Sequence, residues 1–315
     1  MWQVIDAIVV VLLFAIVILV YEIKRRRARI MGHDVLRGQE ITTFDALVHI
    51  SIGLFFAVTY LAFRYFHTPW TFFGFLHAYG LIATFIMPFA LAYLCKGTKQ
   101  AKFVACVMAG VLLLSPLTRP IIMPQMGTRN TVASWEYGIP FNLCNISALL
   151  FLAAILVDNK MFKNFMITMG VFGGIINNTQ IHNVNSANYF WFYHTWESYF
   201  VHALLIIIPL FMILTGQIKP CVKHALVNMI WLIPVYLLAG FVLNPLWGTN
   251  FHFTRPIAVV ENIIPSMSSP WVIFDSYVDP LYMGGLFVLV IISCVILYLF
   301  SAALYKWVRP KFVND

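Results

Sequence analysis

Long apolar runs recur along most of the chain and are separated by short polar segments. A run of about 20 apolar residues can cross the hydrocarbon core of a bilayer as a helix. Such runs occupy residues 3–23, 44–66, 73–94, 102–119, 139–157, 162–180, 190–215, 225–247 and 281–304. We therefore predict an all-α fold, a polytopic transmembrane helical bundle with about nine spans.

The basic residues give this predicted bundle an orientation. Of the 20 Lys and Arg residues, 16 fall in or at the edges of the segments that join spans 1 and 2, 3 and 4, 5 and 6, and 7 and 8, or that follow span 9. The other four are Arg64, Arg119, Arg129 and Arg255. Because cytoplasmic loops are enriched in Lys and Arg, we expect the N terminus outside the cell and the C terminus in the cytosol.

Composition and charge agree with a membrane protein. Hydrophobic residues make up 61% of the chain and charged residues 10%, with a mean hydropathy of +0.85, whereas soluble domains carry about 25% charged residues. The net charge is +8, but the basic residues lie at helix ends rather than in one patch, so nucleic acid is not an expected partner. The five cysteines form no CxxC or Cys/His spacing, which predicts neither a disulfide framework nor a metal site.

Helix counting places several polar residues at one depth. Cys144 precedes Val157, at the end of its span, by 13 residues, and His202 precedes Thr215 by 13 residues. At 1.5 Å per residue, both lie roughly 20 Å from the cytosolic end. The same level is reached by Asn177, Asn178, Ser115 and Arg119. The counting predicts an outward-facing polar cavity ringed by spans 3 to 7.

Span 190–215 presents a polar face to this cavity. His194, Glu197, Ser198 and His202 fall within an arc of about 140° at helical spacing. Ionisable side chains inside a span usually face the bundle interior or a wet cavity.

Cysteine and histidine at matched depth indicate nucleophilic chemistry. A thiol becomes a nucleophile where a base favours the thiolate, so Cys144 and His202 are the candidate catalytic pair. We expect oxyanion stabilisation or substrate positioning from Asn142, Asn145, Asn177, Asn178, His194, Glu197 and Ser198. Arg119 and Arg255 are candidate contacts to a lipid phosphate. Simpler roles also fit: packing for the thiol, interhelical hydrogen bonds for the asparagines, a salt bridge for Glu197 and helix anchoring for the arginines.

The segment 248–280 is the longest predicted outer loop. It is rich in proline and aromatic residues, and loops of this length in a compact bundle are often functional. A lid over the polar cavity is one role that fits it.

Four stretches carry a family resemblance. "IPFNLCNISALL" resembles the "LPxHLC" opening of a helix in the bacterial YwaF-like proteins, which are related to the eukaryotic transmembrane protein 164 family. "YFVHALLIIIPL" resembles their later helix with a single histidine. "GTNFHFTRP" and "SPWVIFD" resemble their final loop. The resemblance covers roughly residues 45–304, so we expect a core at 44–304, preceded by an extra helix with a basic loop at 1–43 and followed by a basic tail at 305–315.

The resemblance implies an activity. The family is similar to a Cys/His membrane acyltransferase that carries an acyl group between phospholipids, and its cysteine and histidine fall on Cys144 and His202. The chain departs from the family pattern at Asn142, where the family has histidine. It also departs in the final loop, with Phe251 for Tyr, Thr254 for Leu and an earlier proline, Pro256.

Three hypotheses follow for function. The first is a phospholipid acyltransferase of the bacterial cytoplasmic membrane, which acts on membrane lipids and needs no metal or soluble cofactor. The second is a transporter or a lipid- or solute-binding protein that uses the same cavity without covalent chemistry. The third is a subunit that only scaffolds partners.

Overall fold

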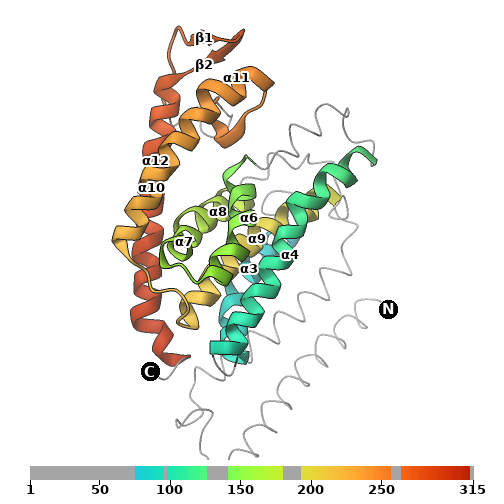
Figure 1. Ribbon diagram of the computed structural model, residues 1–315, viewed down its shortest axis with the longest axis vertical. Helices are drawn as coiled ribbons and strands as arrows, with labels where there is room; N and C mark the ends of the chain where they lie inside the picture. The colour runs from blue at the N-terminus through green and yellow to red at the C-terminus, as the bar shows by residue number, and fades with distance from the viewer. Residues whose placement is uncertain (1–74, 96–97, 126–140, 180–192, 257–263, 313–315) are drawn as a thin grey trace, which may run out of the picture.

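The computed structural model describes residues 75–95, 98–125, 141–179, 193–256 and 264–312, and it is mostly helical (Figure 1). The helices of the first half are α3 (Phe75–Leu94), α4 (Thr98–Gln125), α6 (Leu143–Val157), α7 (Lys160–Phe165), the π-helical turn η1 (Met166–Gly170) and α8 (Val171–Thr179). Those of the second half are α9 (Tyr193–Leu214), α10 (Val222–Leu238), η3 (Ala239–Leu243), α11 (Asn244–Trp247), η4 (Phe251–Phe253), α12 (Pro280–Ala303), η5 (Leu304–Val308) and η6 (Arg309–Lys311).

Helices occupy the positions of the last seven predicted spans. The apolar run 162–180 folds as α7, η1 and α8 in succession, and the run 225–247 as α10, η3 and α11. Within the described residues, three helices are long and apolar enough to cross a membrane: Thr98–Thr118, Val222–Trp247 and Pro280–Val308. The predicted spans 3–23 and 44–66 lie outside the described residues.

Helix α9 is the centre of the bundle. Every residue from Val201 to Thr215 is buried, because α3, α4 and α8 all pack against this helix. Gly80 of α3 lets the Tyr199 side chain approach, and the Tyr199 hydroxyl lies 3.1 Å from Oγ1 of Thr84. The apolar face of α9 therefore contacts other helices rather than lipid.

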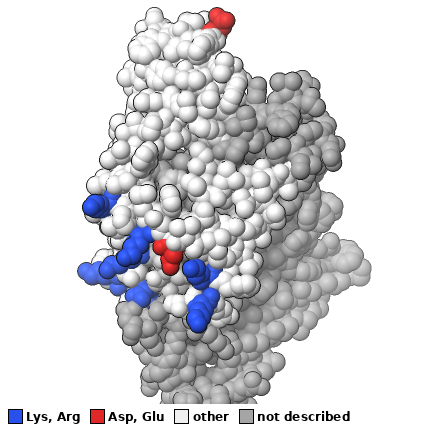
Figure 2. Space-filling view, in the orientation of Figure 1, with Lys and Arg blue, Asp and Glu red and all other residues white. Residues whose placement is uncertain are grey.

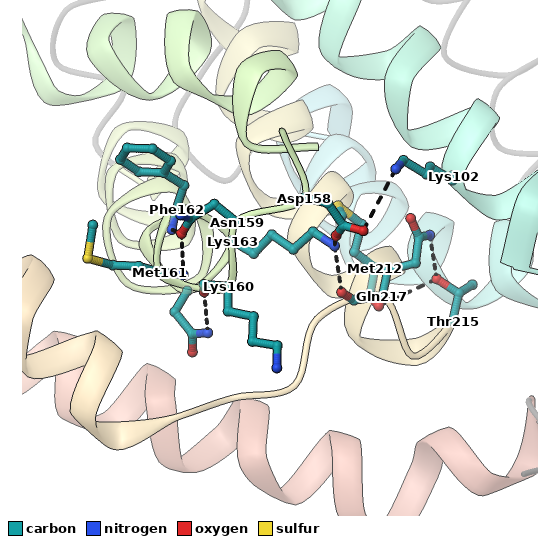
Figure 3. Close-up of polar contacts among 11 residues, drawn as sticks. Lys102, Asp158, Asn159, Lys160, Met161, Phe162, Lys163, Met212, Thr215 and Gln217 are labelled. Atoms are coloured by element: carbon teal, nitrogen blue, oxygen red, sulfur yellow. Dashed lines mark hydrogen bonds and ion pairs between the residues drawn. The ribbon is translucent and has the colours of Figure 1, made fainter. Parts of the chain in front are cut away.

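The connection from α6 to α7 is a tight turn held by side-chain hydrogen bonds (Figure 3). Asp158 ends α6 in the left-handed conformation at φ 59°, and the Asn159 side chain accepts hydrogen bonds from the first turn of α7. Lys163 is buried and donates from Nζ to the Asp158 carboxylate and to the Gln217 carbonyl. These bonds join the α6–α7 turn to the end of α9.

Replacing Asp158 with Asn is expected to lower stability at neutral pH by about 1 kcal/mol or less, because the carboxylate is 61% exposed. The hydrogen bond from Lys163 lowers the pKa of Asp158 below its usual 3.8. The contribution is therefore complete above pH 3.8 and is lost as the pH falls through the lowered pKa. Thermal unfolding of the wild type and of Asp158→Asn in detergent, at neutral and at acidic pH, measures this difference in stability. A difference between the two proteins that persists at the lowest pH would contradict it.

Described Lys and Arg side chains gather toward the end of the molecule that holds the C terminus (Figure 2). They come from the first turns of α4, α7 and α10, from the α9–α10 connection and from η5 and η6, and include Lys99, Lys102, Lys160, Lys219, Lys223 and Lys306. The sequence predicts these segments on one side of the membrane, and the side that faces the cytosol stays a prediction.

The opposite end of α12 carries a short β-hairpin, which departs from the all-α prediction (Figure 1). Strands β1 (Trp271–Ile273) and β2 (Ser276–Val278) pair antiparallel, and Phe274 and Asp275 form the turn with positive φ. The Asp279 side chain caps α12 by accepting a hydrogen bond from the Tyr282 backbone. Part of the predicted loop 248–280 is thus ordered structure.

Candidate functional site

Two glycines of α8 bring the predicted catalytic residues against one helical turn. A Cβ atom at Gly174 would lie 2.6 Å from the His202 backbone oxygen on α9. A Cβ atom at Gly173 would lie 4.0 Å from Sγ of Cys144 on α6. Only glycine at position 174 allows α8 and α9 to approach this closely. Cys144 and His202 therefore lie against consecutive residues of α8.

The ring of His202 is held at both nitrogens. The side chain is 4% exposed, Nδ1 bonds to the Ser198 backbone carbonyl, and Nε2 lies 2.8 Å from Nδ2 of Asn177. Because a carbonyl only accepts, the hydrogen of the neutral ring is on Nδ1, and Nε2 accepts from the Asn177 amide. Nε2 is thus the nitrogen that can take a proton.

Other predicted polar residues are placed as follows. Asn145 and Asn178 are buried, and Ser198 contacts His202 through its backbone carbonyl rather than its hydroxyl. Asn142 immediately precedes α6 but makes no side-chain cap there. Its Oδ1 instead accepts a hydrogen bond from the backbone N–H of His252 at 3.2 Å. An oxyanion role for these residues stays a prediction.

Three predicted site residues lie in described helices, but their side chains are outside the described part of the structure. They are Arg119 in α4 and His194 and Glu197 in α9. Arg255, by contrast, is described, and its Nη2 donates to the Asn244 carbonyl at 2.9 Å and to the Ser276 hydroxyl. These bonds tie the segment after α11 to β2, and the phosphate contact stays a prediction.

Sequence reasoning missed His252. The residue is 9% exposed and has a left-handed backbone, with φ 57°. Burial lowers the pKa of His252 to about 4, although a hydrogen bond to the Phe141 backbone acts in the opposite direction. Its Nε2 is buried and has no hydrogen-bond partner within the described residues. A histidine in an irregular aromatic segment gives no periodic signal, and only the quoted stretch "GTNFHFTRP" marked the region.

The five cysteines are free thiols. Within the part of the chain that the structure describes, no three His, Cys, Asp or Glu residues are grouped so as to hold a metal ion.

The structure has apolar helices of membrane-spanning length. It also has a buried polar cluster between α6, α8 and α9. Together these features define a helical membrane protein that carries an internal polar site. The model of the TMEM164 family matches residues 67–305, which is more than half of the chain. The chain belongs to this family, as the resemblance predicted. Comparisons with curated proteins and with solved structures gave no match.

Proposed function

We propose that the protein is a lipid acyltransferase that transfers an acyl chain through a thioester on Cys144, with His202 as the general base. The placement of Cys144 and His202 against consecutive glycines of α8 is the observation that carries this proposal. The hydrogen bond from Nδ1 of His202 to the Ser198 carbonyl supports it, because this bond leaves Nε2 as the basic nitrogen.

The first half of the reaction forms the thioester. In the resting state Nε2 of His202 accepts from Asn177, so the amide must shift to admit the thiol. Nε2 then takes the proton of Cys144, and the thiolate attacks the ester carbonyl of a phospholipid. The C–O bond breaks, the acyl group stays on sulfur, and the leaving glycerol oxygen takes the proton from His202.

The second half returns the enzyme to its starting state. The hydroxyl of a lysolipid gives its proton to Nε2 of His202 and attacks the thioester carbonyl. The C–S bond breaks, and the Cys144 sulfur regains a proton from His202. In both halves, amide groups of Asn142, Asn145, Asn177 or Asn178 stabilise the oxyanion. No metal or soluble cofactor takes part, because the acyl donor is itself a lipid.

Finer features of the membrane arrangement belong to the same proposal. We infer about nine spans, with the N terminus outside and the C terminus in the cytosol of a bacterial cell. The protein would lie in the cytoplasmic membrane, with membrane lipids as its partners. The gathering of described Lys and Arg side chains at one end supports this orientation (Figure 2).

Lipidomics of cells with and without the protein tests the function. We expect acyl chains to redistribute between phospholipid classes, while the total amount of each chain stays constant, because a transacylase neither makes nor destroys fatty acids. Unchanged acyl distributions at confirmed expression would contradict the proposal. A change in the total amount of fatty acid would indicate a different reaction.

A further inference from the structure

The β-hairpin at the end of α12 presents apolar side chains to its surroundings. Val272 and Tyr277 pair across the two strands, so both side chains project from the same face. They are 65% and 68% exposed, and Phe274 in the turn is 62% exposed. An antiparallel hairpin that meets water normally carries polar residues on its outer face. The outer face of this hairpin therefore suits an apolar environment.

The other face of the hairpin packs on the protein. Val278 is buried in an apolar cluster that includes Tyr282 and Met283 of α12. Trp271, the partner of Val278 across the strands, packs its ring against Phe241 of η3 with 6.0 Å between centroids. The Trp271 side chain is nevertheless 52% exposed. Its ring thus extends past the edge of the protein, and it can report on what surrounds the hairpin.

Hydrogen bonds fix the hairpin on the helices. Asp279, directly after β2, caps α12 by accepting from the Tyr282 N–H at 2.9 Å. Arg255 donates to the Ser276 hydroxyl in β2 and to the Asn244 carbonyl in α11. An isolated two-stranded hairpin is only marginally stable in water. Because this hairpin is bonded to α11 and α12, its apolar side chains are held in a fixed outward position.

The hairpin carries little charge. From residue 264 to residue 279 the chain has no Lys or Arg, and its acidic residues are Asp275 and Asp279. Asp279 is buried, so the exposed charge of this stretch is Asp275 in the turn. On the face seen in Figure 2, this end of the molecule is almost free of charged side chains. Tryptophan and tyrosine are enriched where membrane meets water, because each joins an apolar ring to a polar group. The composition therefore fits a lipid headgroup layer.

The length of α12 sets the depth of the hairpin. The helical segment Pro280–Val308 has 29 residues, which span about 43 Å. A tilt of about 20° shortens this only to about 41 Å, and a bilayer with its headgroup layers is about 40–45 Å thick. Lys306 and Trp307 are exposed at the basic end and mark one headgroup layer. Pro280 therefore reaches the opposite headgroup layer, and the hairpin directly precedes it (Figure 1).

We propose that the hairpin of residues 271–278 is a membrane anchor that lies in the headgroup layer opposite the basic end. Its exposed apolar side chains contact the first methylene groups of the lipid chains, and the Asp275 carboxylate faces water. Val288 and Ile292 of α12 are also exposed, so the anchor continues the surface of a helix that lipid would cover. Through Arg255, the anchor holds the segment after α11 at a fixed depth. The proposal is independent of the thioester chemistry at Cys144.

Quenching of tryptophan fluorescence by brominated lipids measures the depth of the hairpin. The full chain is placed in nanodiscs whose phosphatidylcholine is brominated either close to the headgroup or close to the end of the acyl chain. The wild-type signal minus that of Trp271→Phe is the emission of Trp271, and phenylalanine keeps an aromatic ring beside Phe241. Trp231 of α10 and Trp307 of η5 are the matched controls, because both are at least as exposed as Trp271. Their emission is isolated by the same subtraction.

We expect Trp271 to lose more emission to the shallow bromine than to the deep one, as Trp307 does at the basic end. Trp231 should lose more to the deep bromine, because it lies only about 5 Å from the middle of the span Val222–Trp247. Replacing Val272 and Phe274 together with Glu should abolish the shallow quenching of Trp271, since the added carboxylates keep the turn in water. The same double variant should leave the quenching of Trp231 and Trp307 unchanged, which shows that the bundle is folded.

Three results would overturn the proposal. Quenching of Trp271 by aqueous iodide, without loss to either brominated lipid, would place the hairpin in water, where its apolar face would serve a protein partner instead. Stronger quenching by the deep bromine would place the hairpin in the hydrocarbon core. Unchanged shallow quenching of Trp271 in the double Glu variant would show that the apolar outer face does not hold the hairpin at the membrane.

Discussion

Cys144→Ala is expected to abolish a hydroxylamine-sensitive acyl adduct and to lower acyl transfer by at least about 10³-fold, as expected when a covalent nucleophile is removed. The sulfur is the atom that would hold the acyl chain, and alanine offers none. His202→Asn should lower the rate by about 10²–10⁴-fold, the usual worth of a general base. Mass spectrometry of the intact protein and transfer of a labelled acyl chain between phospholipids measure both effects.

The control is Cys106→Ala. Cys106 is a half-buried cysteine of α4, packed against the same apolar core as Cys144. Its loss should leave both the adduct and the transfer unchanged. An adduct that persists in Cys144→Ala would rule out the proposed nucleophile.

The same variant separates the two main hypotheses. If the cavity serves transport, Glu197→Gln should stop uptake while Cys144→Ala has no effect, because proton coupling needs the carboxylate and not the thiol. Loss of acyl transfer in Cys144→Ala without loss of uptake would favour the enzyme.

Asn244→Ala is expected to destabilise the protein by about 3–5 kcal/mol, in the range of variants that break a buried hydrogen-bond network. Asn244 is fully buried and makes four hydrogen bonds. Its Nδ2 donates to the Phe251 carbonyl and to Oγ1 of Thr254, and its Oδ1 accepts from the Phe251 N–H and the Thr249 hydroxyl. Alanine leaves these buried groups without partners, at roughly 1–3 kcal/mol each before relaxation.

Asn228→Ala is the matched comparison. Asn228 is also buried, but the structure gives its side chain one hydrogen bond, from Nδ2 to the Met161 carbonyl at 3.1 Å. Its loss should cost about 1 kcal/mol. Thermal unfolding in the same detergent, monitored by tryptophan fluorescence, compares the loss of stability in Asn244→Ala with that in Asn228→Ala. Equal destabilisation would mean that the segment after α11 is not held by Asn244.

Depth counting from the sequence anticipated part of the site. Asn177 and His202 were expected at one level because helices rise by a fixed distance per residue, and their side chains are bonded. The same counting brought Cys144 to that level, and Cys144 packs against the turn of α8 that contacts His202. The helical segments at the seven predicted spans from residue 73 onward were predictable because each span has a long apolar run.

The segment after α11 was not predictable in the same way. The bond between Asn142 and His252 joins residues 110 positions apart, and no period in the sequence links them. By sequence alone, Asn142 is equally suited to cap α6, as Asn often does at that position. The hairpin at 271–278 was also missed, because three-residue strands with a Phe-Asp turn give almost no alternation to detect.

The sequence by itself determined that this is a helical membrane protein of the TMEM164 family, since hydropathy and local motifs depend only on neighbouring residues. Only the tertiary structure decided that α9 is surrounded by helices and that Nε2 is the basic nitrogen of His202. Only the tertiary structure brought the buried His252 ring against the ring of Tyr236. Each of these depends on contacts between distant segments, which packing selects and local sequence does not encode.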